Sequence, residues 1–399
     1  MNKIINWLHS FGKNSSEKKI SDINFKDENF KKLLLDLNID SLTEITELNC
    51  RKSDLININE IKYFTNLETL SISSDNLEEL DLTFNEKLKV LTIENCEKLE
   101  EINFSKNIAL EILSLECLLI EKLDLKNNIN LKKIVLDGLN ELDDLDLTDN
   151  INLEELYLSH MRLDASLSAN NKLLKIIYCS YGTSCTWDES GLPELEELTL
   201  ENSEIDSVDV TCFPKLKKLD ITWNQISEID LSKNILLEEL SLADNAFSTI
   251  NLEKNVNLKS LSLGGDHDME SNEYISYTHL DLSNNSKLVD LYINKSGLSE
   301  IDLSKNLSLE TLYIDENPIK SIQLSKNISI NKLAMQNTIL EILDLSVNKK
   351  LGDVTLKNNK LRTIQFPDVT NIVHSSLSKD LLEDKMISHL IEIGLAFEE

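Results

Sequence analysis

The sequence has few of the residues that interrupt regular structure, and few that carry out chemistry. Its 399 residues include four prolines, nine glycines and six histidines, and aromatic residues make up 5%. No apolar run approaches the roughly 20 residues that cross a bilayer, so we expect no membrane span. The sequence also contains no HExxH pair, no G-x-S-x-G elbow and no phosphate-binding loop. These absences exclude several common enzyme motifs, and we expect a protein that is not an enzyme.

Positive charge is also scarce. Lysine and arginine number 40 against 70 aspartates and glutamates, which gives a formal net charge of −30. The acidic residues are spread along the whole chain. Because the phosphates of nucleic acids would be repelled, we expect no nucleic acid ligand, and the charge favours a basic protein partner.

The six cysteines lack metal-type CxxC spacing, so we expect free thiols in a reducing compartment. In an oxidising compartment Cys96 and Cys117, near the same phase of successive repeats, would be able to form a disulfide. The N-terminus has no continuous apolar core and no small-residue cleavage site, which predicts a cytoplasmic protein. Secretion by a signal-independent route is the alternative.

A repeat of about 21 residues dominates the chain. Leu216, Leu219 and Ile221 recur 21 residues later as Leu237, Leu240 and Leu242. Each unit reads L-x-x-L-x-L, then a turn, then an (I/L)-D-L-S-x-N phrase, which predicts a short strand followed by a return segment. The first leucine or isoleucine of fifteen such units stands at 45, 67, 88, 110, 131, 153, 173, 195, 216, 237, 258, 288, 309, 330 and 351.

This pattern resembles the leucine-rich repeat family, and within it the bacterial internalin-like repeats with an LxxLxLxxN strand and an LDLSxN return. The resemblance covers residues 45–366. It implies an α/β solenoid, a horseshoe or arc of about 15 coils with a parallel β-sheet on a concave face that binds other proteins. Some internalin-like arrays carry a cysteine ladder in the strand, and here we expect only Cys50 at that inward position.

The two ends of the chain follow a helical period. Residues 1–44 are predicted to form N-terminal helices that cap the solenoid, with Phe30, Leu33, Leu34 and Leu37 on one face of the second helix. The first helix has a docking peptide as its alternative role. The solenoid is assigned to 45–371, and residues 372–399 are predicted to form a C-terminal capping helix.

Recurring polar residues in the return segments are interpreted as structural. Asparagines at one phase would satisfy backbone groups in the turns; they are Asn107, Asn128, Asn150, Asn234, Asn255, Asn306, Asn327 and Asn348. The neighbouring aspartates predict a solvated acidic stripe, with calcium binding as the alternative. A metal site at Asp266, His267, Asp268 and Glu270 is a further alternative, but we expect neither metal nor cofactor.

Candidate partner-binding residues are the large side chains that the repeat does not require. The third, fifth, seventh and eighth places of each unit should face solvent, and six large side chains stand at such places: Tyr157, His160, Ile177, Trp223, Tyr292 and Tyr313. Tyr292 and Tyr313 share one place in successive units, so their rings should lie about 5 Å apart. Two interruptions of the repeat, at 178–193 and 264–279, add Tyr181, Trp187, Tyr274 and Tyr277.

Three functions follow from these residues. The first is a non-enzymatic scaffold that binds another protein, such as a basic toxin that it neutralises. The second is a surface or secreted adhesin or effector of the internalin type. The third is a hydrolase that uses Cys179 or Cys185 with His160, although we find no oxyanion site for it.

Overall fold

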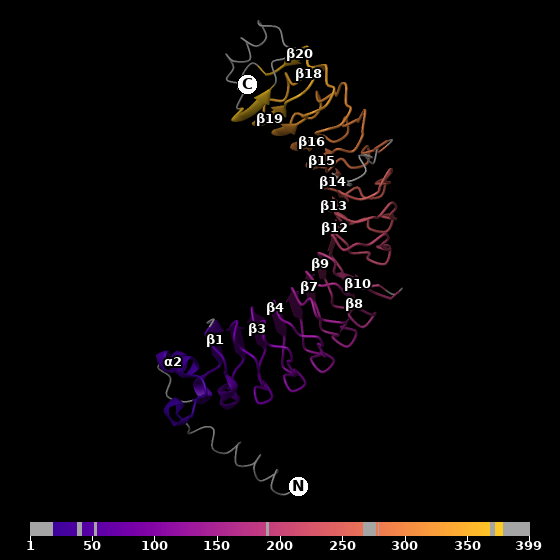
Figure 1. Cartoon of the computed structure of the whole chain (residues 1–399). Helices are drawn as coiled ribbons and strands as arrows, with labels where there is room; N and C mark the ends of the chain where they lie inside the picture. The colour runs from indigo at the N-terminus through magenta and orange to yellow at the C-terminus, as the bar shows by residue number, and fades with distance from the viewer. Residues whose placement is uncertain are drawn as a thin grey trace. The chain divides into compact units, whose positions relative to one another are not determined.

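The computed structural model describes residues 19–37, 42–51, 54–188, 191–265, 277, 279–367 and 372–377. It consists of two compact units, Met1–Leu195 and Glu196–Glu399. Both are parallel β-solenoids, in which every repeat contributes one short strand to a sheet and then returns along the other side (Figure 1).

The first unit begins with short helices. These are η1 (Ile20–Asp22), α2 (Glu28–Asp36), η2 (Leu42–Glu44) and, after the first strand, η3 (Asn59–Tyr63). Its main sheet runs in the order β1 (Glu47–Arg51), β2 (Thr69–Ser73), β3 (Val90–Glu94), β4 (Ile112–Glu116), β5 (Lys133–Asp137), β7 (Glu155–Ser159) and β9 (Ile176–Ser180). On the return side, β6 (Leu145–Asp146), β8 (Asp164–Ser166) and β10 (Ser184–Thr186) form a small second sheet.

The second unit repeats the same plan. Its main sheet runs in the order β11 (Glu197–Glu201), β12 (Lys218–Asp220), β13 (Glu239–Ser241), β14 (Ser260–Gly264), β15 (Asp290–Asn294), β16 (Thr311–Tyr313), β17 (Lys332–Ala334), β19 (Asp353–Leu356) and β21 (His374–Leu377). On its return side β18 (Ile342–Asp344) pairs with β20 (Thr363–Gln365).

Each of the fifteen predicted repeats has its strand, and β21 adds one more. This strand lies inside 372–399, the range predicted as a capping helix, so that the solenoid continues past the predicted boundary at 371. Leu377 is 2% exposed because it pairs with Leu356 in the sheet instead of lying on a helical face. Residues 378–399, where the remainder of the helix was predicted, lie outside the described residues.

The strand register corrects one repeat by a single residue. Leu156 pairs with Ile177, and Leu158 pairs with Cys179. The first leucine of this repeat is therefore Leu174, which is fully buried, and not Leu173, which is 44% exposed. A shift of one residue exchanges the two faces of a strand.

Two predictions change as a result. Ile177 was predicted to contact a partner, and that prediction is wrong because its side chain is only 1% exposed. Cys50 is not the only inward cysteine of a main-sheet strand, because Cys179 is also fully buried. The residues of this strand that face outward are Ile176 and Tyr178.

The repeated asparagines form a buried ladder within each unit, and their structural role is as predicted. The side-chain nitrogen of Asn128 donates to the carbonyls of Phe104 (3.2 Å) and Asn107 (2.9 Å) in the preceding coil. Each further asparagine repeats this pattern with its own preceding coil, and all are 0% exposed: Asn85, Asn107, Asn150 and Asn171 in the first unit, and Asn234, Asn255, Asn285, Asn306, Asn327 and Asn348 in the second.

Helix α2 lies where the second N-terminal helix is predicted. Phe30, Leu33 and Leu34 are buried, whereas Leu37 at its end is 42% exposed. The helix is fixed by Asp27, whose Oδ1 accepts the N–H groups of Asn29 (2.8 Å) and Phe30 (3.1 Å). The predicted first helix at 1–13 lies outside the described residues. Within the described part of the chain, we find no helix with the length and apolar character needed to span a bilayer.

Asp27 also attaches the helix to the first coil. Its Oδ2 accepts the N–H groups of Ile56 (2.7 Å) and Asn57 (3.2 Å). Burial of the Asp27 carboxyl opposes its ionisation, but the four backbone N–H groups outweigh burial and lower its pKa below the usual value of 3.8. The ionised carboxylate therefore holds the cap in place.

Loss of one ladder amide should destabilise the solenoid. We expect Asn128→Ala to lower the free energy of unfolding by about 1–3 kcal/mol, because buried carbonyls lose their donor. Urea denaturation would measure the change. Asn130→Ala is the matched control, since Asn130 also donates to a carbonyl, that of Ile108 at 2.9 Å, but is exposed. Equal effects of the two substitutions would contradict a special role for the ladder.

The Asp27 cap should weaken in acid. A depressed folded-state pKa contributes stability above the unfolded value, and this contribution is lost as the pH falls through the folded value. We expect Asp27→Asn to destabilise the protein by about 1–2 kcal/mol at neutral pH, and the difference from wild type to shrink below about pH 4. Urea midpoints at several pH values would test this, with Glu28→Gln as an exposed neighbouring control. A difference that stays constant with pH would contradict it.

Candidate functional site

The eighth residue of most repeats adopts a left-handed backbone. At the eighth place φ is +52° at His160 and +53° at Tyr181, which stand in successive repeats, and +61° at Trp223, two repeats later. Such a conformation costs a residue other than glycine about 1–2 kcal/mol. The three side chains are exposed at the edge of the sheet face, and a large ring at a strained, exposed place points to a role outside the core.

Four aromatic rings gather on the first unit, and we name Tyr157, His160, Tyr178 and Tyr181 the aromatic patch. The rings of Tyr157 and Tyr178 lie 6.3 Å apart at 33°. Those of His160 and Tyr181 stack at 4.4 Å with an interplanar angle of 7°. Two neighbouring coils, with strands β7 and β9, supply all four rings, because the repeat places equivalent positions side by side.

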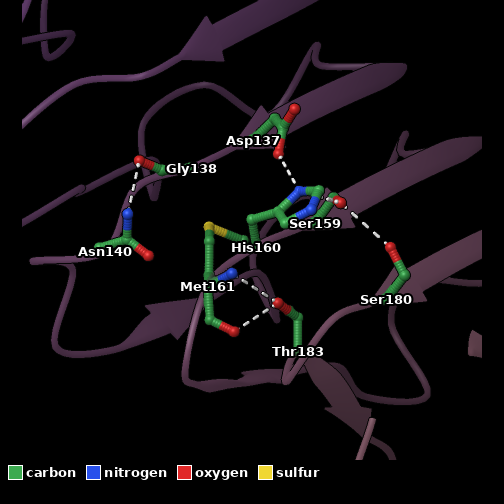
Figure 2. Close-up of polar contacts among 8 residues, drawn as sticks. All are labelled: Asp137, Gly138, Asn140, Ser159, His160, Met161, Ser180 and Thr183. Carbon is green, nitrogen blue, oxygen red and sulfur yellow. Dashed lines mark hydrogen bonds and ion pairs between the residues drawn. The ribbon is translucent and has the colours of Figure 1, made fainter. Parts of the chain in front are cut away.

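Hydrogen bonds fix the orientation of the His160 ring. Its Nδ1 lies 2.8 Å from Oδ1 of Asp137 and 2.8 Å from Oγ of Ser159, which in turn contacts Oγ of Ser180 at 3.0 Å (Figure 2). The following turn is tied down by Thr183, whose hydroxyl accepts the N–H of Met161 and donates to its carbonyl (Figure 2). These bonds hold the His160 ring and the turn that carries Thr183 in one arrangement.

A shallow depression of about 310 Å³ lies beside the patch. Its lining includes the rings of Tyr157 and Tyr178 and the carboxyl groups of Glu116 and Asp137. Lys133 also lines it, but its ammonium group pairs with Glu155 at 2.8 Å and lies 4.7 Å from the centre of the Tyr157 ring. The ion pair with Glu155 raises the pKa of Lys133. The depression thus combines aromatic rings with an excess of carboxylates.

The second unit has a smaller aromatic pair. Tyr292 and Tyr313 occupy paired positions of β15 and β16, and their rings lie 5.3 Å apart in an edge-to-face arrangement. This confirms the predicted proximity of the two rings. Burial, with Asp290 nearby, raises the pKa of Tyr292. Trp223, in the same unit, is 47% exposed at the end of its strand.

The other predicted contact residues fare differently. Tyr277 is only 4% exposed, and burial raises its pKa strongly, so the prediction that it meets a partner is wrong. Its ring fills the core at the end of the 264–279 interruption instead of reaching solvent. Trp187 is half-buried, whereas Tyr274 lies outside the described residues. The 178–193 interruption is not a simple loop, because it contains β10, which pairs with β8.

Tyr178 is the patch residue that the sequence did not reveal. The one-residue error in the repeat assigned its strand to the wrong face. The signal was available, since 153, 174 and 195 are evenly spaced by 21 whereas 173 is not.

The geometry contradicts the predicted cysteine–histidine pair. Cys179 is fully buried, and burial raises its pKa well above the usual value, so it stays protonated and is a poor nucleophile. His160 faces solvent and bonds to Asp137 and Ser159. Cys179 instead contacts Cys185, with the two sulfurs 2.8 Å apart.

The described residues contain no group of three or more His, Cys, Asp or Glu side chains arranged to hold a metal ion. The aspartates of the predicted acidic stripe accept backbone N–H groups within their own turns, as Asp230 does from Ser232 at 2.8 Å. The alternative metal site at 266–270 lies outside the described residues.

Ion pairs connect the second places of several neighbouring repeats. A lysine in one coil pairs with a glutamate in the coil before it; the pairs are Lys89–Glu68, Lys132–Glu111 and Lys175–Glu154 in the first unit, and Lys217–Glu196 and Lys259–Glu238 in the second. Glu111 raises the pKa of Lys132, and Lys132 lowers that of Glu111. The positive charges of these lysines therefore balance the negative charges of the glutamates along this edge of the sheet face.

Solved structures share this fold. The functional domain of InlJ from Listeria monocytogenes, which includes a cysteine ladder, is 23% identical over 86% of this chain and 76% of its own, with a TM-score of 0.63. A leucine-rich repeat protein of Leptospira interrogans is 16% identical over 94% of this chain and 100% of its own, with a TM-score of 0.67. The matching chain of the glycosylated Toll–Spätzle complex of Drosophila is 17% identical over 84% of this chain and 57% of its own, with a TM-score of 0.54.

These likenesses confirm the predicted leucine-rich repeat fold, a parallel solenoid of about 15 turns. No protein-family model matches the sequence, and no curated protein does.

The left-handed place of Trp223 gives a test of backbone strain. We expect Trp223→Gly to have a free energy of unfolding about 1 kcal/mol above that of Trp223→Ala, because only glycine adopts φ near +60° without steric cost. Both variants remove the ring, so urea denaturation of the pair isolates the backbone. Equal stability of the two variants would show that this turn relaxes when the ring is removed.

Proposed function

We propose that this chain is a non-enzymatic scaffold that binds another protein through the sheet face of its first unit, with the aromatic patch at the centre of the contact. The observation that carries the proposal is the aromatic patch, whose four rings the repeat does not require. Two of them, His160 and Tyr181, stack on each other and stand on a left-handed backbone. Tyrosine rings of this kind dominate the energetics of protein interfaces. Toll, which shares the fold, was solved in complex with Spätzle.

The partner that fits this surface is basic. Glu116 and Asp137 line the depression beside two tyrosine rings, while the one lysine in the lining is engaged by Glu155. An arginine or lysine side chain of the partner would find ring faces for a cation–π contact and carboxylates for hydrogen bonds. The net charge of −30 would favour the approach of the same partner. A basic toxin neutralised by this chain is one such partner.

The proposed location is the cytoplasm. A surface or secreted adhesin of the internalin type is the second candidate, and the likeness to the InlJ domain favours it. Protease treatment of intact cells separates the two, since an adhesin would be cleaved and a cytoplasmic scaffold would survive until lysis.

Removing the Tyr157 and Tyr178 rings should lower the affinity for the partner without lowering the stability of the fold. A partner retained by the tagged wild-type chain from native lysate would be purified and titrated by calorimetry. We expect Tyr157→Ala with Tyr178→Ala to raise Kd at least about tenfold, since two hot-spot side chains are lost. Binding should also weaken at high salt.

The matched control is Ser71→Ala with Thr92→Ala, which alters the same place of strands β2 and β3. It should leave Kd unchanged, and all variants should melt like wild type. An unchanged Kd for the tyrosine variant would refute the patch as the binding site. An acidic partner whose binding is insensitive to salt would refute the charge argument.

A further inference from the structure

Two thiols meet in the core of the first unit. Cys179 stands in β9 of the main sheet and Cys185 in β10 of the return sheet, with their sulfur atoms 2.8 Å apart. Cys179 is fully buried, and Cys185 is 7% exposed. Their equivalents one coil earlier are Leu158 and Ala165, so the repeat itself does not demand sulfur at either place.

The chain between the two cysteines is short and already fixed at both ends. Gly182 has φ of +78° and reverses the chain, and Thr183 bonds twice to the backbone of Met161 in the coil before. The opposed positions of the sulfurs therefore do not depend on a mobile loop. A covalent bond between them would need only a small shortening of an existing contact.

We propose that Cys179 and Cys185 form an intramolecular disulfide when the folded chain meets a small disulfide oxidant such as oxidised glutathione. The Cys185 thiolate attacks one sulfur of the oxidant and releases the first glutathione thiolate. The Cys179 thiol, which is held against Cys185, then attacks the Cys185 sulfur as its proton passes to the second glutathione thiolate, which departs. The two protein thiols lose two protons and two electrons, and the oxidant becomes two glutathione thiols.

The order of attack follows from access. Cys185 is the more exposed of the two, whereas burial and the neighbouring Cys185 both hold the Cys179 thiol protonated, with a raised pKa. Once the mixed disulfide forms on Cys185, Cys179 is the resolving thiol because of its position.

The bond would close a loop that carries part of the aromatic patch. Tyr181 lies between the two cysteines and stacks on His160 at 4.4 Å. Closing the loop removes conformations from the unfolded chain, and it also restrains the backbone that presents this ring. The modification site thus lies directly beneath one edge of the surface described above, although it does not depend on that surface binding a partner.

Peptide mapping of the folded, full-length protein tests the proposal. The reduced chain is incubated with excess oxidised glutathione, quenched in acid, alkylated and digested with trypsin and a glutamate-specific protease. Cleavage after Lys175 and Glu189 yields one peptide that holds both cysteines and excludes Cys212. We expect this peptide to lose both alkylation sites and two hydrogen masses, without a glutathione adduct.

Variants make the result specific. Cys179→Ala should trap glutathione on Cys185, and Cys185→Ala should leave Cys179 unmodified. Cys117, which is exposed, should acquire glutathione in every sample and shows that the oxidant is active. Oxidation should raise the melting temperature of the wild type by a few degrees, but not that of Cys179→Ala. A wild-type peptide that keeps both alkylation sites, or that carries a stable glutathione adduct, would overturn the proposal.

Discussion

The hydrogen bond from each buried asparagine to the coil before it is the interaction on which the solenoid depends. A single coil cannot provide donors for the carbonyls of its own turns, and those carbonyls are buried once the next coil is added. The amide of Asn128 solves this problem for the coil of Asn107, whose carbonyl accepts both this amide and the N–H of Leu110. Stability is therefore shared between neighbours.

The ladder also explains how the solenoid tolerates an insertion. Asn285 follows Asn255 by 30 residues instead of the usual 21, and its amide still reaches the carbonyls of Leu252 (3.2 Å) and Asn255 (2.9 Å). Strands β14 and β15, on either side of the insertion, keep their parallel pairing. The insertion therefore leaves both the asparagine bond and the sheet register intact.

Much of this architecture could be predicted from the sequence, because each coil places its leucines and asparagines directly beside those of the next coil, and the sequence period therefore equals the length of one coil. The errors arose where the sequence allows two positions for the first leucine of a repeat. At Leu173 and Leu174 two adjacent leucines satisfy the pattern equally well, and only the register with Leu153 and Leu195 separates them. With Leu173 as the first leucine, Tyr178 was predicted to face the core, and Ile177 and Cys179 were predicted to face solvent, where Cys179 would lie near His160.

Other errors came from side chains that serve the core at irregular places. Leu377 fits a helical period, but it lies in strand β21, which pairs with the edge of the sheet at β19. Tyr277 stands in an interruption, where exposure is the usual expectation, yet its side chain is buried. No local pattern distinguishes these cases, since each depends on a space that other coils create.

The distribution of charge limits how the acidic surface can act. Around two open depressions on the return side of the first unit lie carboxylates such as Glu78, Glu97 and Glu100, whereas the lysine–glutamate row neutralises one edge of the sheet face. At physiological salt, charges separated by more than about 8 Å are largely screened. The return side can therefore raise the encounter rate only weakly for a partner bound on the sheet face. In the proposed contact, Glu116 and Asp137 are the carboxylates that line the depression together with the rings.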